Sequence, residues 1–172
     1  MKKRSIPSGA DLTALYREWA GDYPKFFKMD ILSKLGFLLT EMLVKGEEGR
    51  FQPREDRAVL VFSREGCVAN DRHYAASMAD FPSPALFVYT LPNIVSGEIA
   101  IRNKYAGETS AYVLEKYDEA QLGVLVREAF QDRCTQSAVV AWINCPSDTE
   151  WEAAAWLVTR EEILNDFCIF AR

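Results

Sequence analysis

The stretch SPALFVYTLPNIVSGEIAIRNKYAGETSAYVLEK, residues 83–116, combines chain-breaking residues with apolar runs of two different periods. Prolines interrupt regular structure in and just before its first part: Pro82, Pro84 and Pro92. After Asn93, residues 94–105 carry apolar side chains at helical spacing, and residues 109–114 form a short apolar run typical of a strand. The stretch therefore predicts an irregular entry, a helix and a strand. Small residues in the helix would allow close packing: Ser96, Gly97 and Ala100.

The regions on either side of this stretch contain clearer periodic patterns. Residues 31–43 have apolar side chains three and four positions apart, with Asp30 as a predicted N-cap and Gly46 as a stop. Residues 57–63, RAVLVFS, predict a strand covered on both faces. A second amphipathic helix follows Asp118, and its apolar face should pack on the sheet: Leu122, Leu125, Val126 and Phe130.

The order of these elements predicts the fold class. Strands alternate with helices through short connections, which favours a layered α/β domain with a largely parallel sheet. Residues 137–145 and 150–160 predict two further strands joined by a short polar turn, hence an antiparallel pair. The tail from residue 161 predicts a short helix and strand. With no repeat and no linker, residues 1–172 are expected to form a single domain.

Composition excludes several classes of function. Apolar residues make up 49% of the chain, enough for a substantial core, and the net charge is -5. No basic stripe interleaved with aromatic residues is present, so nucleic acid is not an expected partner. No apolar run reaches 18 residues, and the start MKKRSIPSGADL has no apolar stretch behind its basic residues. We therefore expect a cytoplasmic protein without membrane attachment.

Metal and cofactor sites have no support in the sequence. The single histidine is His73, and no two of the four cysteines have the spacing of a zinc site: Cys67, Cys134, Cys145 and Cys168. Scattered thiols of this kind are usually small apolar core residues. No glycine-rich phosphate loop is present, so no cofactor is predicted.

The opening stretch resembles the β-ketoacyl-acyl-carrier-protein synthases of the thiolase superfamily. The resemblance covers residues 32–145. It rests first on a Ser-Pro-x-x-Phe-like entry and on an Asn followed four residues later by Gly. A helix with alternating Ile comes next, and a second Gly stands fourteen residues after the Asn. The matching residues are Ser83, Pro84, Phe87, Asn93, Gly97, Ile99, Ile101 and Gly107. It implies a thiolase-like layered fold, as in an N-terminal half-domain of such an enzyme.

The same resemblance implies that the catalytic nucleophile is replaced. In the family the nucleophilic cysteine follows the second glycine by nine residues, and nine residues after Gly107 stands Lys116. A thiolate at a helix N-terminus is a good acyl acceptor because its pKa is lowered there, whereas a protonated lysine cannot form the thioester. The family's two catalytic histidines lie in a second half outside the matched segments, and His73 lies in the wrong segment to replace either. We therefore expect no condensing activity.

Three functions remain open. The first is a catalytically silent accessory or partner subunit in fatty-acid or polyketide-type synthesis. The second is a module that binds an acyl chain or an acyl carrier protein, with Lys116 either simply solvated or meeting phosphopantetheine or the acidic carrier surface. The third is a condensing or acyl-transfer enzyme that uses Cys67, with His73 as base, or residues of a partner.

Association is the last expectation. In the thiolase superfamily the strand before the nucleophile pairs with its twin across a twofold axis, and here that strand would contain Thr109, Ser110, Ala111, Tyr112, Val113 and Leu114. An apolar edge left open in a monomer is a site of unwanted pairing. We expect a homodimer, or a heterodimer with a full-length ketosynthase along the same edge.

Overall fold

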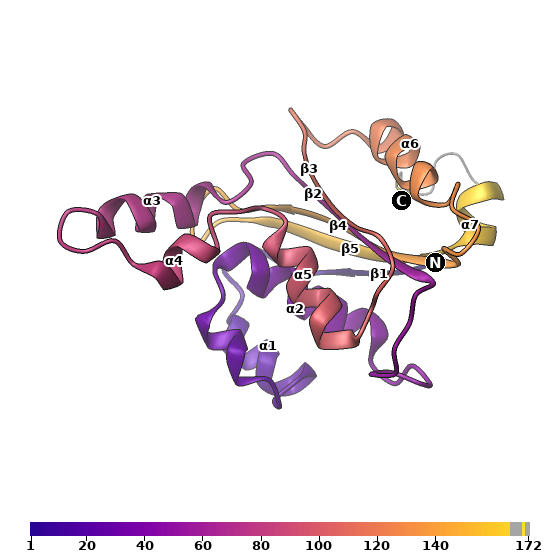
Figure 1. Ribbon diagram of the computed structural model, residues 1–172, viewed down its shortest axis with the longest axis horizontal. Coiled ribbons are helices and arrows are strands. Elements are labelled where there is room, and N and C mark those ends of the chain that lie inside the picture. The colour runs from indigo at the N-terminus through magenta and orange to yellow at the C-terminus, as the bar shows by residue number, and fades with distance from the viewer. Residues whose placement is uncertain (166–169, 171–172) are drawn as a thin grey trace.

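The computed structural model describes residues 1–165 and residue 170, and its centre is a five-stranded mixed sheet with the strand order β1-β5-β4-β2-β3 (Figure 1). β2 (Arg57–Ser63) runs parallel to β3 (Thr109–Val113) on one side and to β4 (Ser137–Asn144) on the other. β5 (Glu152–Thr159) is antiparallel to β4 and to β1 (Lys2–Ser5). Within the described residues, four strands therefore share one direction and β5 opposes them. The largely parallel sheet and the antiparallel pair are both confirmed.

Helices cover both faces of this sheet (Figure 1). One face carries α1 (Leu12–Trp19), α2 (Ile31–Val44) and α5 (Ile94–Asn103), with the short 3-10 helix η1 (Pro24–Lys28) beside α2. The other face carries α6 (Glu119–Ala129) and α7 (Arg160–Asn165). Two further helices, α3 (Val68–Ser77) and α4 (Pro84–Val88), project from one end of the molecule. The layered α/β fold class is confirmed.

The fully apolar run of β2 reflects burial on both faces. Val59 and Val61 belong to the core under α2 and α5, whereas Leu60 and Phe62 belong to the core under α6. Successive residues of a strand point to opposite faces, so a strand covered twice needs no polar alternation. β4 is buried along its whole length for the same reason.

Helix starts follow the predicted capping residues. The Asp30 Oδ1 atom accepts a hydrogen bond from the backbone N–H of Ser33 at 3.0 Å, and the Asp118 Oδ1 atom accepts one from Gln121 at 3.0 Å. Each bond satisfies a backbone donor that has no partner inside the helix. On α6, Leu122, Val126 and Phe130 are buried against the sheet as predicted, and Leu125 is half-buried in the same core.

Several local expectations differ from the structure. β1, α1 and η1 were not predicted. The strand expected over residues 109–114 ends at Val113, although the Leu114 N–H still donates to the Ser63 carbonyl at 2.8 Å. Cys134 is exposed rather than part of the core, because α6 ends before it. The predicted C-terminal helix is present as α7, and the strand after it falls mostly outside the described residues.

The two motif glycines have opposite surroundings. An ideal Cβ atom on Gly107 would lie 2.5 Å from the Arg57 carbonyl oxygen and 2.9 Å from that of Glu55. The chain must therefore pass directly against the backbone of β2 before entering β3, which only glycine permits. An ideal Cβ on Gly97 would meet no atom within 4 Å. The expectation that Gly97 allows close packing inside this chain is wrong for the described residues.

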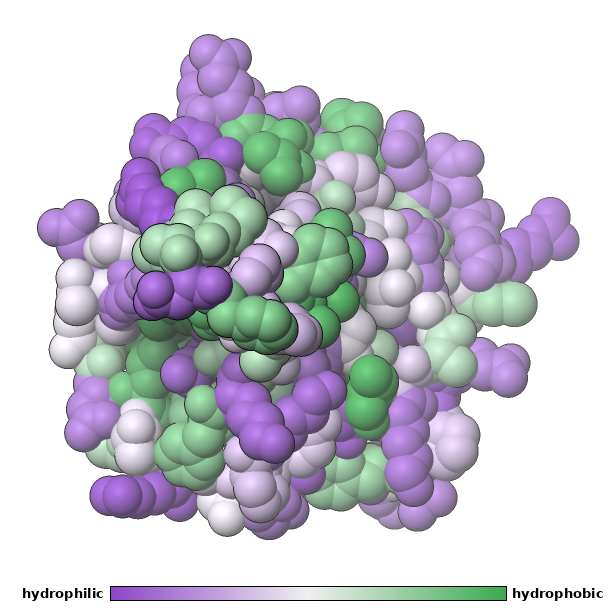
Figure 2. Space-filling view, turned by 60° about the vertical axis from the view of Figure 1, so that its left-hand side comes forward, coloured by the Kyte–Doolittle hydropathy of each residue, from purple (hydrophilic) through white to green (hydrophobic). Residues whose placement is uncertain are grey.

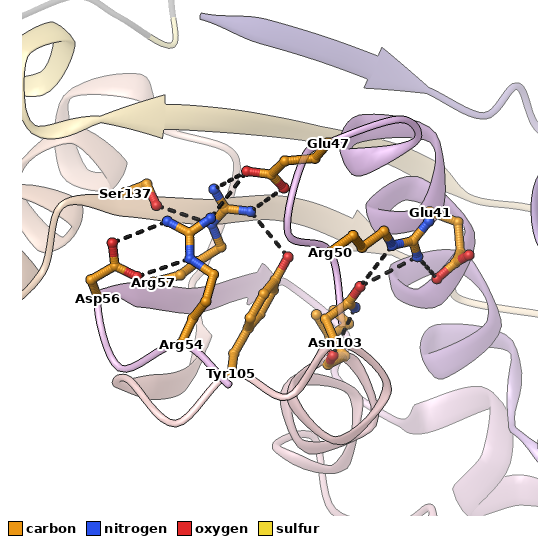
Figure 3. A network of polar contacts seen from close by, with 10 residues as sticks. Glu41, Glu47, Arg50, Arg54, Asp56, Arg57, Asn103, Tyr105 and Ser137 are labelled. Carbon is orange, nitrogen blue, oxygen red and sulfur yellow. Dashed lines mark hydrogen bonds and ion pairs between the residues drawn. The ribbon is translucent and has the colours of Figure 1, made fainter. Parts of the chain in front are cut away.

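A buried ion-pair network joins the amino-terminal ends of β2 and β4 to the loop after α2 (Figure 3). The Arg57 guanidinium, buried although it starts an apolar strand, donates two hydrogen bonds of 2.6 Å to the Glu47 carboxylate. It also donates to the Tyr105 hydroxyl at 3.1 Å and the Ser137 hydroxyl at 3.0 Å. These contacts supply the pairing that a buried charge needs, and hydrogen bonds from Arg57 hold the pKa of Glu47 below its usual range.

The two glycines predict a matched pair of stability changes. Gly107→Ala should lower the free energy of unfolding by about 1–3 kcal/mol, because β3 must move away from Arg57. Gly97→Ala should leave it unchanged or raise it by up to about 1 kcal/mol, because alanine is the better helix former and meets no neighbour. Urea unfolding of the two variants checks both values. Equal destabilisation by both changes would contradict the close approach of β3 to β2.

The Glu47–Arg57 pair predicts a pH dependence. A carboxyl whose folded-state pKa is lowered stabilises the fold above its unfolded pKa of about 4.3, and that contribution disappears as the pH falls through the folded pKa. Glu47→Gln should therefore be less stable than the parent at pH 7, with the difference shrinking between pH 5 and pH 3. Denaturation at several pH values measures this, and a constant difference would show that the charge of Glu47 contributes nothing.

Candidate functional site

The carboxyl ends of the parallel strands surround a cleft of about 540 Å³ that contains Lys116. In α/β folds this edge of the sheet is where ligands and reactive groups usually meet. The end of β4, the start of β5 and the loops after β1, β2 and β3 form the cleft. Its lining residues are Ser8, Arg64, Lys116, Tyr117, Trp142, Asn144, Pro146, Glu150, Trp151 and Glu152.

Hydrogen bonds and ring contacts fix the walls of this cleft. The Asn144 Oδ1 atom accepts from the backbone N–H of Glu65 at 2.9 Å and of Arg64 at 3.2 Å, which ties the end of β4 to the turn after β2. The Trp142 indole N–H donates to Glu152 at 3.3 Å, and the ring of Tyr117 meets that of Trp142 edge-on at 5.2 Å. The walls are therefore held by side chains, not only by the backbone.

Lys116 lies where β3 leads toward α6, two residues before the capping Asp118. Its side chain is exposed, and the cleft around it also holds Arg64, Glu150 and Glu152. The resemblance identified this position, but no sequence pattern links it to Trp142 and Asn144, which lie at the end of the mostly apolar run of β4. A charged, aromatic-walled cleft can hold a polar group in place.

Cys67 is not placed as a nucleophile. It is buried at the start of α3, where burial, with the charges of Asp30 and Asp71, raises its thiol pKa to about 12. His73, the proposed base, pairs instead with Asp148, with 2.9 Å between Nε2 and Oδ2. Cys145 is also buried, and burial raises its pKa as well. Among the described residues, no hydrogen bond joins Cys67 to His73.

A second hollow of about 380 Å³ lies between the start of α2 and the helices α3 and α4. Asp30, Asn70, His73 and Tyr89 all contribute to its walls. Burial raises the pKa of Asp30, and its Oδ2 atom has no hydrogen-bond partner among the described residues. This hollow is separate from the cleft at Lys116.

The remaining motif residues shape other parts of the surface. Ser83 caps α4 with a hydrogen bond of 3.4 Å from the Leu86 N–H, and Pro84 occupies its first turn. Phe87 is exposed on α4 beside the ring of Tyr74. The Asn93 side chain makes no capping bond, and its carbonyl accepts from the Ser96 hydroxyl at 2.8 Å. The motif from Ser83 to Gly97 is therefore not part of the Lys116 cleft.

β3 lies at an open edge of the sheet, as expected. The Glu108 carbonyl and the Leu114 N–H bond to β2, and alternate residues of a strand point to the same side. The backbone groups of Thr109, Ala111 and Val113 consequently face the free edge. Tyr112 stacks on Phe62 of β2 with 5.0 Å between ring centroids, so the alternate side chains pack on the α6 side.

Two large aliphatic side chains are exposed, one on β3 and one on α5, the helix that packs against β3. Val113, on the opposite face of β3 from Tyr112, is 58% exposed, and Ile101 on the neighbouring α5 is 65% exposed. Gly97 precedes Ile101 by one helical turn and opens into free space. An unpaired strand edge beside exposed aliphatic residues is a typical protein-binding surface.

Comparison with known proteins identifies relatives only at the level of structure. No family model matches the chain, and no curated protein matches its sequence. The ishigamide ketosynthase/chain length factor superposes with a TM-score of 0.71 and 16% identity, over 90% of this chain and 49% of that one. The ketosynthase ApeO in complex with its chain length factor ApeC, from Xenorhabdus doucetiae, gives a TM-score of 0.64 at 14% identity, over 92% of this chain and 77% of that one.

These matches show the fold. The chain has the thiolase-like fold of ketosynthase and chain length factor structures, and it spans about half the length of the first of them. Among the described residues, no group of three or more His, Cys, Asp or Glu side chains is placed to hold a metal ion. In that same part of the chain, every helix is too short or too polar to cross a membrane.

Thiol reactivity checks the description of the cysteines. At pH 7.5, iodoacetamide should alkylate the exposed Cys134 quickly and leave Cys67 and Cys145 unmodified in the folded protein, because a pKa of about 12 or above leaves almost no thiolate. Peptide mass spectrometry measures each site, and all three should react in urea.

A long-chain acyl thioester should likewise leave no adduct on Cys67. A stoichiometric adduct that Cys67→Ser abolishes would restore the enzyme hypothesis.

Proposed function

We propose that this chain is a catalytically silent ketosynthase-like subunit that pairs with a full-length ketosynthase in fatty-acid or polyketide-type synthesis. The observation that carries the proposal is the open β3 edge with exposed Val113 and Ile101. Support also comes from the fold, which this chain shares with structures described as a ketosynthase and its chain length factor.

The geometry of the edge favours pairing with another strand. The outward N–H and C=O groups of Thr109, Ala111 and Val113 can form an antiparallel ladder with an equivalent strand across a twofold axis. Such pairing would satisfy the open backbone groups and cover Val113 together with Ile101 of α5. An isologous homodimer would use the same groups, so the edge alone is compatible with both assemblies.

Catalytic silence is proposed from the residues at the carboxyl edge. Lys116 stands where the resemblance places the nucleophile, and an ammonium cannot carry an acyl group as a thioester. The raised pKa of the Cys67 thiol argues against a substitute nucleophile. The alternative of a module that binds an acyl chain or an acyl carrier protein stays a prediction, with Lys116 and Arg64 in the cleft as its candidate contacts.

Ala111→Pro tests the pairing directly. Proline removes the outward N–H of Ala111 and leaves the hydrogen bonds from β3 to β2 in place, as proline at an edge strand does. Co-expressed with a full-length ketosynthase from the same organism, the parent chain should elute as a complex, and the variant should bind at least about tenfold more weakly, a loss of about 1.4 kcal/mol. Size-exclusion chromatography with light scattering and a titration measure both.

Ala111→Thr is the matched control, because it retains the N–H and suits a strand. It should bind like the parent, and both variants should keep the parent's melting temperature within a few degrees. Without a ketosynthase, light scattering should report a mass near twice 19.5 kDa if the edge pairs with itself. A parent chain that stays monomeric in the presence of the ketosynthase would refute the proposed function.

A further inference from the structure

The segment from α3 through α4, residues 68–91, forms an arm that projects from the end of the sheet (Figure 1). No residue from 71 to 88 is buried. From residue 74 to residue 92 the chain has a single charged residue, Asp80, although charged residues make up 26% of the whole sequence. Solvated surface is normally rich in charge, whereas the core of a protein interface is depleted of it.

Large apolar side chains are concentrated on this exposed arm. Phe81 is 77% exposed and Phe87 54% exposed. Met78, Val88 and Leu91 are each about half exposed. Figure 2, which brings this end of the molecule forward, shows apolar groups gathered on the surface. An apolar patch of this kind on one element indicates a protein-binding surface.

Polar contacts hold the base of the arm against the body. The Arg72 guanidinium donates to the Pro146 carbonyl at 2.7 Å, and His73 pairs with Asp148 in the same loop. Within the arm, the Asn70 side-chain amide donates to the Leu86 carbonyl at 2.9 Å, which joins α3 to α4. The polar side chains thus fasten the arm to the rest of the molecule, whereas its large apolar side chains are exposed to solvent.

The arm also carries a preformed notch of about 240 Å³. Tyr74, Pro82, Ser83, Pro84 and Phe87 line it, and the rings of Tyr74 and Phe87 are 5.4 Å apart. Rings and prolines lose little conformational freedom on binding, so such a notch can receive an apolar side chain at low entropic cost. Pockets of this type hold the anchor residues of protein interfaces.

The arm is continuous with the open edge of the sheet. An ideal Cβ on Gly66, just before the arm, would lie 3.8 Å from Val113 of β3 and 3.9 Å from Pro92, just after the arm. The next exposed large apolar residue along the chain after Leu91 is Ile101, on α5, which packs against β3. A partner that pairs along β3 would therefore reach the root of the arm.

We propose that the arm is a second docking element for the ketosynthase, and that the notch between Tyr74 and Phe87 receives an apolar side chain of that subunit. The inference rests on the proposed function and adds to it a second, side-chain-specific contact away from the sheet edge. The ketosynthase is the occupant because the arm and the β3 edge form one continuous surface. If the partner covered the β3 edge but not the arm, the apolar side chains of the arm would remain exposed to water.

The test compares three variants in the purified complex with the ketosynthase. Phe87→Ser removes one wall of the notch, and Ala85→Glu adds a charge to an exposed arm position without removing any buried group. Val124→Ser, at a 51% exposed position of α6 on the other face of the sheet, is the matched control. Both arm variants should weaken binding at least about tenfold with unchanged melting temperatures, and Val124→Ser should bind within about twofold of the parent.

The outcomes separate the two proposals. If the parent chain binds the ketosynthase and both arm variants bind equally well, the arm proposal is wrong and the β3 pairing stands. If the parent chain binds no ketosynthase, both proposals fail together. If Phe87→Ser instead breaks up a homodimer and leaves ketosynthase binding intact, a second copy occupies the arm and the proposal is again overturned. Loss of binding in both arm variants, with Val124→Ser unaffected, supports it.

Discussion

The close approach of Gly107 to the backbone of β2 is the constraint on which the open β3 edge of the sheet depends. The chain leaves α5, crosses against the Arg57 carbonyl and enters β3 with Thr109 opposite Val59. That register decides which backbone groups of β3 bond to β2 and which point outward. Because a one-residue shift would reverse both faces of the strand, the glycine also determines that Tyr112 packs inward on Phe62 while Val113 is left exposed.

The ion-pair network holds in place the same part of β2 that Gly107 packs against. Arg57, whose carbonyl Gly107 approaches, is held at its side chain by Glu47, Tyr105 and Ser137 (Figure 3). Tyr105 precedes Gly107 by two residues, so the network fixes the segment that leads into β3. Nearby, Arg50 bonds to Glu41 of α2 and Asn103 of α5. Each of these guanidinium groups is paired with a carboxylate, and the pairing favours one arrangement of the backbone.

The sequence predicted the elements that have a strong local signal. Asp30 and Asp118 cap their helices, and the uninterrupted apolar runs of β2 and β4 reveal strands covered on both faces. β1 was missed because KKRS has no apolar pattern; an edge strand needs only backbone groups to pair with β5. No local signal distinguishes Gly97, which faces open space, from Gly107, which touches another strand. That difference arises only from the tertiary arrangement.

At the candidate site, too, one residue could be found from the sequence, whereas its neighbours are brought together only by the fold. The family resemblance selected Lys116 through its spacing from Gly107, but the surroundings of Lys116 come from several strand ends and loops, which no sequence pattern links. The arm was visible in sequence as a proline-interrupted segment with one charge, a pattern equally typical of a buried connection. Only the structure shows that these apolar residues lie outside the core.

A lysine at the carboxyl edge has a physical consequence for any complex this chain forms. An ammonium withdrawn from water without a partner costs several kcal/mol, so a bound subunit must either leave Lys116 solvated or supply it with an anion. The cleft already contains Glu150 and Glu152 with Arg64, which gives two acids and two bases in one space. Arg64 already pairs with Glu65 at 2.7 Å, so Glu150 and Glu152 are the acids of the cleft that remain as candidate partners for Lys116. A partner on the apolar edge of β3 that reached this cleft would therefore meet acidic as well as basic side chains there.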